Sequence, residues 1–388
     1  MTDAAGYVAA PARRRASGLA ATDVAIVVGA FVVSRLLLTL YGLFVLTMSK
    51  DPLYVPALPD LFARWDSEWY LSLAQGGYST VDLHPNQPGA TNYAFYPLYP
   101  LLMWLVSSVS GLSLAWAGVL ISNLCFLAAL FIIFMLAEDW SADKNVARLA
   151  VLLLCCVPGG VVFSAVYTES LFVLLTSASM LLFERRRYAA AGICAGLSSA
   201  VRSNGVLVIV YGGLSLLREQ GLMRTLRFWN EPERYLPIVM APLGLFAFWW
   251  MAMLTTGDAF AQASTAAHGW QWHSTWPWVT IAERAVSSNI RESWPMLASL
   301  VVFLGSLTLL RRRSWPLFAY CLANFLLFWT GTSPNSLLRY SIVLFPIYFG
   351  VAQALATRRL VAAIVLFGCL AGEVMTMGLW AHGSVLVV

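Results

Sequence analysis

Long apolar runs alternate with short polar segments along the chain. Successive apolar runs approach or exceed the roughly 20 residues that a helix needs to cross a bilayer. The pattern therefore predicts an all-α polytopic membrane protein with about eleven transmembrane helices. The expected spans lie at about 22–47, 114–137, 148–166, 168–184, 188–203, 205–217, 235–255, 293–310, 315–331, 338–356 and 360–382.

The composition supports this class of protein. Of the 388 residues, 60% are hydrophobic and 11% are charged, against roughly 25% charged residues in soluble domains. No polar linker divides the chain, so we expect one membrane-embedded domain over 1–388. The formal net charge of +5 resides in short loops and does not form the basic face that nucleic-acid binding needs.

The distribution of basic residues predicts the orientation, because cytoplasmic loops are enriched in Lys and Arg. The run 97–110 has about 14 residues and begins at Pro97, so we expect it to stay at the outer surface. The cytoplasmic side then holds 17 of the 24 basic residues and the outer side holds six. This arrangement predicts a cytoplasmic N-terminal tail over 1–21 before a retained first span. It also predicts two large extracytoplasmic loops, 48–113 with juxtamembrane helices and 256–292.

The apolar stretch 188–217 is expected to be broken. A single helix would place Arg185–Arg187 and Arg218 on opposite sides of the membrane, against the charge rule. We therefore expect a break at Arg202-Ser203-Asn204-Gly205. Broken helices are tolerated in membranes where the freed backbone lines a cavity, so the break indicates a site.

Two ionisable residues, Arg35 and Glu373, fall inside expected spans, where charge is costly and is usually paired or functional. Their mutual pairing is one option. All six cysteines also fall within expected spans and resemble small packing residues. The chain has no P-loop and no dinucleotide-binding glycine motif in a strand–helix context, so we expect no cofactor, no nucleotide site and no metal.

The predicted topology brings polar residues from five separate segments to the outer face, where they could form one pocket. These residues are Asp66, Glu68, His84, Tyr167, Glu169, Arg202, Asn204, Asp258, His268, His273, Asn335 and Arg339.

Asp66 is the strongest catalytic candidate among them. If residues 62–74 form a surface helix, Asp66, Trp69 and Tyr70 share one face, whereas Glu68 points away. A carboxylate beside rings is partly desolvated, which suits a general base. The alternative is an ordinary solvated acid or helix cap.

Arg202 and Arg339 each stand alone at the end of a span. A guanidinium at this depth can bind a phosphate through two hydrogen bonds. It can equally extend to the interface without any ligand. Phosphate binding is favoured more for Arg202, because it lies at the helix break.

The remaining candidates are substrate contacts. Glu169 lies at the start of a span, two positions after Tyr167, where it can neutralise a helix N-terminus, bind a sugar hydroxyl or orient an arginine. Two histidines and four tryptophans share the loop 256–292, as a stacking surface or as an interfacial belt. The expected substrate-contacting residues are Glu68, Trp69, Tyr70, Tyr167, Glu169, Asn204, His268 and His273.

Four blocks of the chain resemble the PIG-V mannosyltransferases, a family of the GT-C superfamily of membrane glycosyltransferases. The most specific is Arg64-Trp65-Asp66-Ser67-Glu68-Trp69-Tyr70, which is followed by 74–78 and by Phe95-Tyr96-Pro97-Leu98-Tyr99-Pro100. The others are 158–172, Arg202-Ser203-Asn204-Gly205 and 339–346. The similarity runs in order over about 34–350.

The resemblance implies an inverting transfer of mannose from a polyprenyl phosphate donor to an acceptor on the non-cytoplasmic face. It implies Asp66 as the base that takes the acceptor proton. It also implies Arg202 or Arg339 as the group that holds the departing lipid phosphate.

The composition is rich in Arg and poor in Lys, and the chain has no Asn-x-Ser/Thr site, which fits a bacterial source. The usual acceptor of the eukaryotic family therefore does not transfer, and a glycolipid, a lipoglycan and a secreted protein all stay open. A related enzyme that uses arabinose or glucose is the nearest alternative. A transporter or lipid flippase is a more distant one, because transporters tend to show paired repeats and sites at the bilayer midplane.

Overall fold

The computed structural model describes residues 19–49, 57–81, 88–312, 314–331, 336–384 and 386, and in these residues the regular structure is helical. The α-helices are α1 (Ala21–Ser49), α2 (Leu58–Phe62), α3 (Ser67–Gly76), α4 (Leu98–Ser110), α5 (Leu114–Ser141), α6 (Lys144–Cys155), α7 (Glu169–Glu184), α8 (Tyr188–Val201), α9 (Val208–Leu226), α10 (Leu236–Met240), α11 (Leu243–Thr256), α12 (Ala261–Gly269), α13 (Pro277–Ala285), α14 (Ile290–Ser306), α15 (Trp315–Phe328), α16 (Leu337–Ile342), α17 (Pro346–Leu355) and α18 (Arg359–Ala381). The 3₁₀ turns are η1 (Asn92–Ala94), η2 (Gly160–Phe163), η3 (Ser203–Leu207), η4 (Phe228–Asn230), η5 (Pro232–Tyr235) and η6 (Leu307–Arg312).

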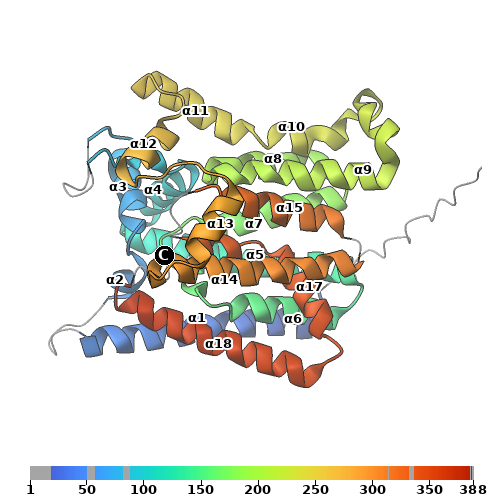
Figure 1. Ribbon diagram of the computed structural model, residues 1–388, viewed down its shortest axis with the longest axis horizontal. Coiled ribbons are helices and arrows are strands. Elements are labelled where there is room, and N and C mark those ends of the chain that lie inside the picture. The colour runs from blue at the N-terminus through green and yellow to red at the C-terminus, as the bar shows by residue number, and fades with distance from the viewer. Residues whose placement is uncertain are drawn as a thin grey trace, which may run out of the picture.

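The all-α polytopic membrane class is confirmed. Five helices are long and apolar enough to cross a membrane, or six when the bent pair Pro232–Met240 and Leu243–Thr256 is one span. Shorter apolar helices such as α8, α15 and α17 accompany them. Figure 1 shows α5 and α7 in the middle of the bundle, with α1 and α18 on one side and α8 to α11 on the other. The number of eleven spans stays a prediction.

Several expected spans contain breaks that hydropathy does not reveal. The expected span 148–166 is wrong beyond Cys155, because Pro158 cannot continue a helix and Gly159 has a φ of +84°. The expected span 338–356 is divided into α16 and α17 before Pro346, and 235–255 is divided before Pro242. Each break follows from a residue that favours a helix end.

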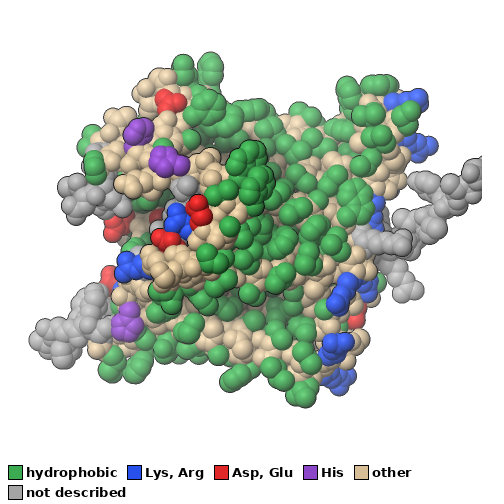
Figure 2. Space-filling model, in the orientation of Figure 1, with side chains coloured by type: hydrophobic (Ala, Val, Ile, Leu, Met, Phe, Trp, Pro, Cys, Tyr) green, Lys and Arg blue, Asp and Glu red, His purple; other side chains and the backbone are tan. Residues whose placement is uncertain are grey.

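The short run after Pro97 forms α4, as its length suggested. Its 13 residues rise about 20 Å, which is less than the roughly 30 Å of a hydrocarbon core. In Figure 1, α4 lies at the same end of the bundle as α3, α12 and the C-terminus. Figure 2 shows Lys and Arg side chains along the opposite edge. Which of the two ends faces the cytoplasm stays a prediction.

The break expected at 202–205 is confirmed. Helix α8 ends at Val201, Arg202 adopts an extended conformation with φ −154° and ψ 143°, and η3 leads into α9. Gly205 lets the chain turn back closely, because a Cβ there would lie 2.3 Å from the Ser198 carbonyl carbon and oxygen.

Gly205→Ala is therefore expected to destabilise the protein by about 1–3 kcal/mol, the usual cost of overpacking. The measurement is the thermal unfolding midpoint in detergent. Gly213→Ala in α9 is the matched control, because its Cβ would meet no described atom within 4 Å. That control is expected to be neutral or slightly stabilising. Equal midpoints for the two variants would contradict the close packing at Gly205.

The continuous surface helix that we considered over 62–74 does not form. The chain instead forms α2 and α3, separated by a turn in which Trp65 has a φ of +56°. The Phe62 carbonyl accepts a hydrogen bond from Val166 N at 3.0 Å. The Arg64 guanidinium donates to the carbonyls of Trp380 and Ala381 at 3.1 and 2.8 Å. These long-range bonds replace helical ones and leave Asp66 as the N-cap of α3.

Candidate active site

A cavity of about 980 Å³ opens at the end of the bundle that carries α3 and α12. It is bordered by the α2–α3 turn, η1, the start of α7, the α8–η3 break, α12 with the segment after it, and α16. The lining residues are Trp65, Asp66, Glu68, Trp69, Tyr70, Ala94, Phe95, Tyr96, Thr168, Val201, Arg202, Ser203, Asn204, Gln262, Ala263, Ala266, Trp270, Trp272, Ser274, Leu327, Phe328, Ser336, Leu337, Arg339 and Tyr340.

The carboxylate of Asp66 forms an ion pair at the cavity wall. Its Oδ2 lies 2.8 Å from Nη1 of Arg339, and the two side chains are 24% and 5% exposed. The position of Asp66 before the first turn of α3 lets its side chain face the cavity without joining the helix. Trp69 and Tyr70, the rings that we expected on the same face, line the same cavity, and the Asp66 carboxylate itself pairs with this guanidinium.

Glu169 forms ion pairs with both arginines. Its Oε1 lies 2.6 Å from Nη1 of Arg202 and 3.2 Å from Nε of Arg339. The Glu169 side chain is 1% exposed, so its charge depends on both guanidiniums for compensation. With Asp66, the four groups carry two positive and two negative formal charges. An anionic ligand would therefore compete with the carboxylates for the two guanidiniums.

Aromatic rings hold the guanidiniums in place. The Tyr340 ring lies under both, with its centroid 4.5 Å from Cζ of Arg202 and 5.0 Å from Cζ of Arg339. The Tyr167 ring contacts Arg339 at 4.8 Å, and Phe172 lies 5.8 Å from Arg202. Such cation–π contacts attract the guanidiniums to the ring faces and favour these orientations of the arginine side chains.

A second aromatic cluster forms another part of the wall. The Trp69 ring stacks on Phe95 at 5.7 Å and meets Trp270 edge-on at 5.2 Å. The Tyr70 hydroxyl lies 3.4 Å from Oγ1 of Thr168. Burial raises the pKa of Tyr96 to about 12 and also raises the pKa of Tyr70. Both phenols therefore stay neutral at physiological pH, and flat apolar faces beside neutral hydroxyls suit a sugar ring.

The structure brings most of the expected site residues together. Asp66, Glu68, Trp69, Tyr70, Arg202, Asn204 and Arg339 line the cavity, and Tyr167 and Glu169 contact its arginines. Glu68 was expected to point away from the others, and this was wrong, because Glu68 lines the same cavity as Asp66, Trp69 and Tyr70. Asn204 also donates to Oδ1 of Asn324 at 2.9 Å.

His268 and His273 do not line the cavity. His268 is exposed on α12, and its Nδ1 lies 2.7 Å from the Ser264 carbonyl, whereas Gln262 and Ala266 of the same helix face the cavity. His273 is exposed between Trp272 and Ser274, which do line it. A substrate contact by either histidine stays a prediction that this geometry does not support. His84 and Asn335 lie outside the described residues.

Sequence reasoning missed Tyr340 as a site residue and gave Gln262 no role. Tyr340 directly follows Arg339, and this was the signal that could have identified it, because adjacent residues at a helix start can face one cavity. Gln262 carried no signal, since the register of α12 is set by tertiary packing. Within the described ranges, no group of three or more His, Cys, Asp or Glu side chains could hold a metal ion.

Comparisons with known proteins agree with this picture. Residues 56–248 match the family model of the PIG-V mannosyltransferases. A GPI α-1,6-mannosyltransferase 2 from Homo sapiens is 32% identical over 198 residues, which is 48% of this chain and 37% of the relative. A GPI mannosyltransferase 2 from Yarrowia lipolytica is 30% identical over 37% of each chain. This chain thus matches less than two fifths of the length of either relative.

Two solved structures share the fold at low sequence identity. ArnT from Cupriavidus metallidurans bound to undecaprenyl phosphate superposes with a TM-score of 0.53 and 15% identity, over 95% of this chain and 77% of that one. The oligosaccharyltransferase from Archaeoglobus fulgidus with zinc and sulfate gives a TM-score of 0.51 and 13% identity, over 92% of this chain and 53% of that one. The fold is of the GT-C type, and the match over 56–248 identifies this chain as a PIG-V-like member of the mannosyltransferase family.

Proposed function

We propose that this protein transfers mannose from a polyprenyl-phosphate-mannose donor to an acceptor hydroxyl, with inversion at the anomeric carbon. One observation carries the proposal: a carboxylate at the wall of a cavity lies 2.8 Å from a guanidinium that a buried glutamate ties to a second guanidinium. A base next to a phosphate-binding pair is what this reaction needs.

The reaction assigns one role to each charged group. The acceptor oxygen forms a bond to the anomeric carbon while the bond from that carbon to the phosphate oxygen breaks. The Asp66 carboxylate takes the acceptor proton, and the polyprenyl phosphate departs with the bonding electron pair. Arg202 and Arg339 stabilise the charge on the phosphate, because fixed guanidiniums need no reorganisation during transfer.

The surroundings of the arginines favour a lipid-linked donor. Leu327, Phe328 and Leu337 line the cavity close to Arg339 in the sequence and offer an apolar path for a prenyl chain. A structural relative bound to undecaprenyl phosphate supports a polyprenyl phosphate as the leaving group. The aromatic cluster around Trp69 and Trp270 would then receive sugar rings.

The acceptor and the orientation belong to the same proposal. We propose that the cavity opens to the extracytoplasmic side, with a cytoplasmic N-terminus, and that the acceptor is a glycolipid, a lipoglycan or a secreted protein. Glycolipid acceptors are supported by the names of the GPI mannosyltransferase relatives.

The decisive experiment incubates purified protein in lipid nanodiscs with radiolabelled polyprenyl-phosphate-mannose and a membrane lipid extract. Transfer of label to lipid or glycan is expected with this donor and not with GDP-mannose, because the donor would be recognised through a lipid phosphate. Parallel reactions with polyprenyl-phosphate-linked glucose and arabinose test the sugar. Transfer from GDP-mannose alone, or from none of the lipid donors, would overturn the proposal.

A further inference from the structure

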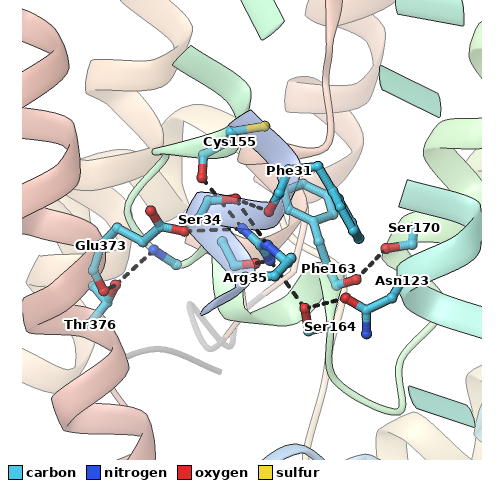
Figure 3. A network of polar contacts seen from close by, with 12 residues as sticks. Phe31, Ser34, Arg35, Asn123, Cys155, Phe163, Ser164, Ser170, Glu373 and Thr376 are labelled. Atoms are coloured by element: carbon cyan, nitrogen blue, oxygen red, sulfur yellow. Dashed lines mark hydrogen bonds and ion pairs between the residues drawn. The ribbon is translucent and has the colours of Figure 1, made fainter. Parts of the chain in front are cut away.

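Arg35 of α1 and Glu373 of α18 form an ion pair inside the bundle, as Figure 3 shows. Nη2 of Arg35 lies 3.2 Å from Oε1 of Glu373, and the two side chains are 8% and 0% exposed. Neither residue lines the cavity, and the proposed reaction uses neither. Charges at such depth are costly to bury and are usually kept for a function.

Arg35 also binds the irregular backbone that follows α6. Its Nη1 donates to the Gly160 carbonyl at 2.9 Å and to Oγ of Ser164 at 3.2 Å, and Nη2 lies 3.4 Å from the Cys155 carbonyl. Non-helical backbone inside a membrane protein needs such partners, because lipid offers none. Arg35 therefore stabilises the segment 155–168, which connects α6 to α7 through η2.

Helix α18 holds the same segment from the other side. Oγ1 of Thr376 accepts a hydrogen bond from Gly159 N at 2.9 Å. Gly372 allows the Pro158 ring to approach, since a Cβ there would lie 2.8 Å from Pro158 Cγ. Glu373 thus brings both Arg35 and its own helix against the break after α6.

The segment leads directly to the active-site charges. Four residues beyond Ser164 lies Thr168, which contacts Arg202, and then Glu169, which contacts both arginines. Val166 N donates to the Phe62 carbonyl at 3.0 Å, at the end of the helix that precedes Asp66. A displacement of this segment would therefore move Glu169 and Asp66 together.

We propose that the Arg35–Glu373 pair is a positioning device for the active site, which acts through the 155–168 segment and never touches substrate. The inference rests on the proposed function. Loss of the pair is expected to lower the rate strongly, because a misplacement of about 1 Å can cost about a hundredfold in rate.

The test compares Arg35→Gln and Glu373→Gln with Asp23→Asn. Asp23 lies on the same helix as Arg35, is also buried, and pairs with Lys144 and Arg148 at 2.8 and 2.6 Å. The two glutamine variants are expected to lower kcat at least tenfold, with the acceptor KM within threefold. Asp23→Asn is expected to stay within threefold in kcat at a similar loss of Tm. Arg35→Lys should recover part of the rate, because it keeps a cation opposite Glu373.

A milder pair keeps the test decisive if Arg35→Gln does not fold. Ser164→Ala removes one hydrogen bond between Arg35 and the segment, together with the bond that Ser164 Oγ donates to Oδ1 of Asn123 at 2.9 Å, and is expected to lower kcat at least threefold. Ser179→Ala removes an equally buried hydroxyl on α7, which donates to the Ala191 carbonyl on α8 at 2.9 Å. That control should stay within twofold.

A readout that needs no catalysis separates this inference from the proposed function. Thr168→Cys places a thiol on the segment, and its labelling by a hydrophilic maleimide is followed by mass spectrometry. Arg35→Gln is expected to raise the labelling rate at least fivefold over the Asp23→Asn background. If the parent protein transfers no mannose, the proposed function fails and labelling alone decides. Equal labelling in the two backgrounds, or a kcat for Arg35→Gln within twofold of the parent, would overturn the positioning role.

Discussion

Asp66→Asn is expected to lower mannosyl transfer by about 10²–10⁴-fold, the usual contribution of a general base. The amide cannot take the proton of the acceptor hydroxyl, yet it has the same size as the carboxylate. Folding should be little affected, because the Asp66 side chain is 24% exposed and water can replace its contacts. The measurement is kcat at saturating polyprenyl-phosphate-mannose, with binding of polyprenyl phosphate measured alongside.

Asp139→Asn is the matched control for this variant. The Asp139 side chain is also 24% exposed and lies 4.0 Å from an arginine, Arg185. Asp139 and Ser122 lie on the same helix, α5, 17 residues or about 25 Å apart. Asp139 is therefore remote from the segment before α7, to which the Ser122 hydroxyl donates a hydrogen bond. The control should transfer mannose at the parent rate. Near-normal turnover by Asp66→Asn would refute its role as the base.

Arg202→Ala is expected to raise the donor KM by about 10- to 100-fold, since a hydrogen bond to a charged group contributes about 1.5–3 kcal/mol. The donor KM of Arg202→Lys should lie between the values for the parent protein and for Arg202→Ala. An ammonium keeps the charge but cannot reproduce the planar contact with the Tyr340 ring at 4.5 Å or a two-pronged grip on phosphate. Titration with polyprenyl phosphate measures the binding step directly.

Arg284→Ala provides the control for charge alone. Arg284 pairs with Glu292 at 2.7 Å and does not line the cavity. Its removal should leave the donor KM unchanged. If Arg202→Ala bound polyprenyl phosphate as tightly as the parent protein, the assignment of Arg202 to the phosphate would be wrong.

Local patterns were sufficient for part of the site. The break at 202–205 was predictable, because the Arg clusters at 185–187 and at 218 cannot lie on opposite sides of the membrane without cost. Asp66, Arg202 and Arg339 line the cavity for a related reason. Polar side chains at the ends of spans are costly to expose to lipid, so they lie at an interface or in a shared pocket. The pairing of Arg35 with Glu373 was only one option at the level of the sequence, and the 3.2 Å contact in the structure decides for it.

Other features could not be read locally. The turn that divides 62–74 exists because Val166 and Trp380 bind the backbone of α2 from distant parts of the chain. No sequence pattern encodes such partners. The exclusion of His268 from the cavity wall likewise depends on how α12 is rotated against the aromatic cluster at Trp69, and that of His273 depends on the path of the chain after α12.

The sequence by itself determined that the protein is helical and membrane-embedded and which residues are too polar for lipid, because hydropathy and charge act over a single turn or span. Only the tertiary structure decided which charges meet. Arg339 pairs with Asp66, and Glu169 joins Arg339 to Arg202, because α3, α7, α8 and α16 converge at one end of the bundle. The physical reason is that ion pairs act across a few ångströms in space, whereas these residues are separated by up to 273 positions along the chain.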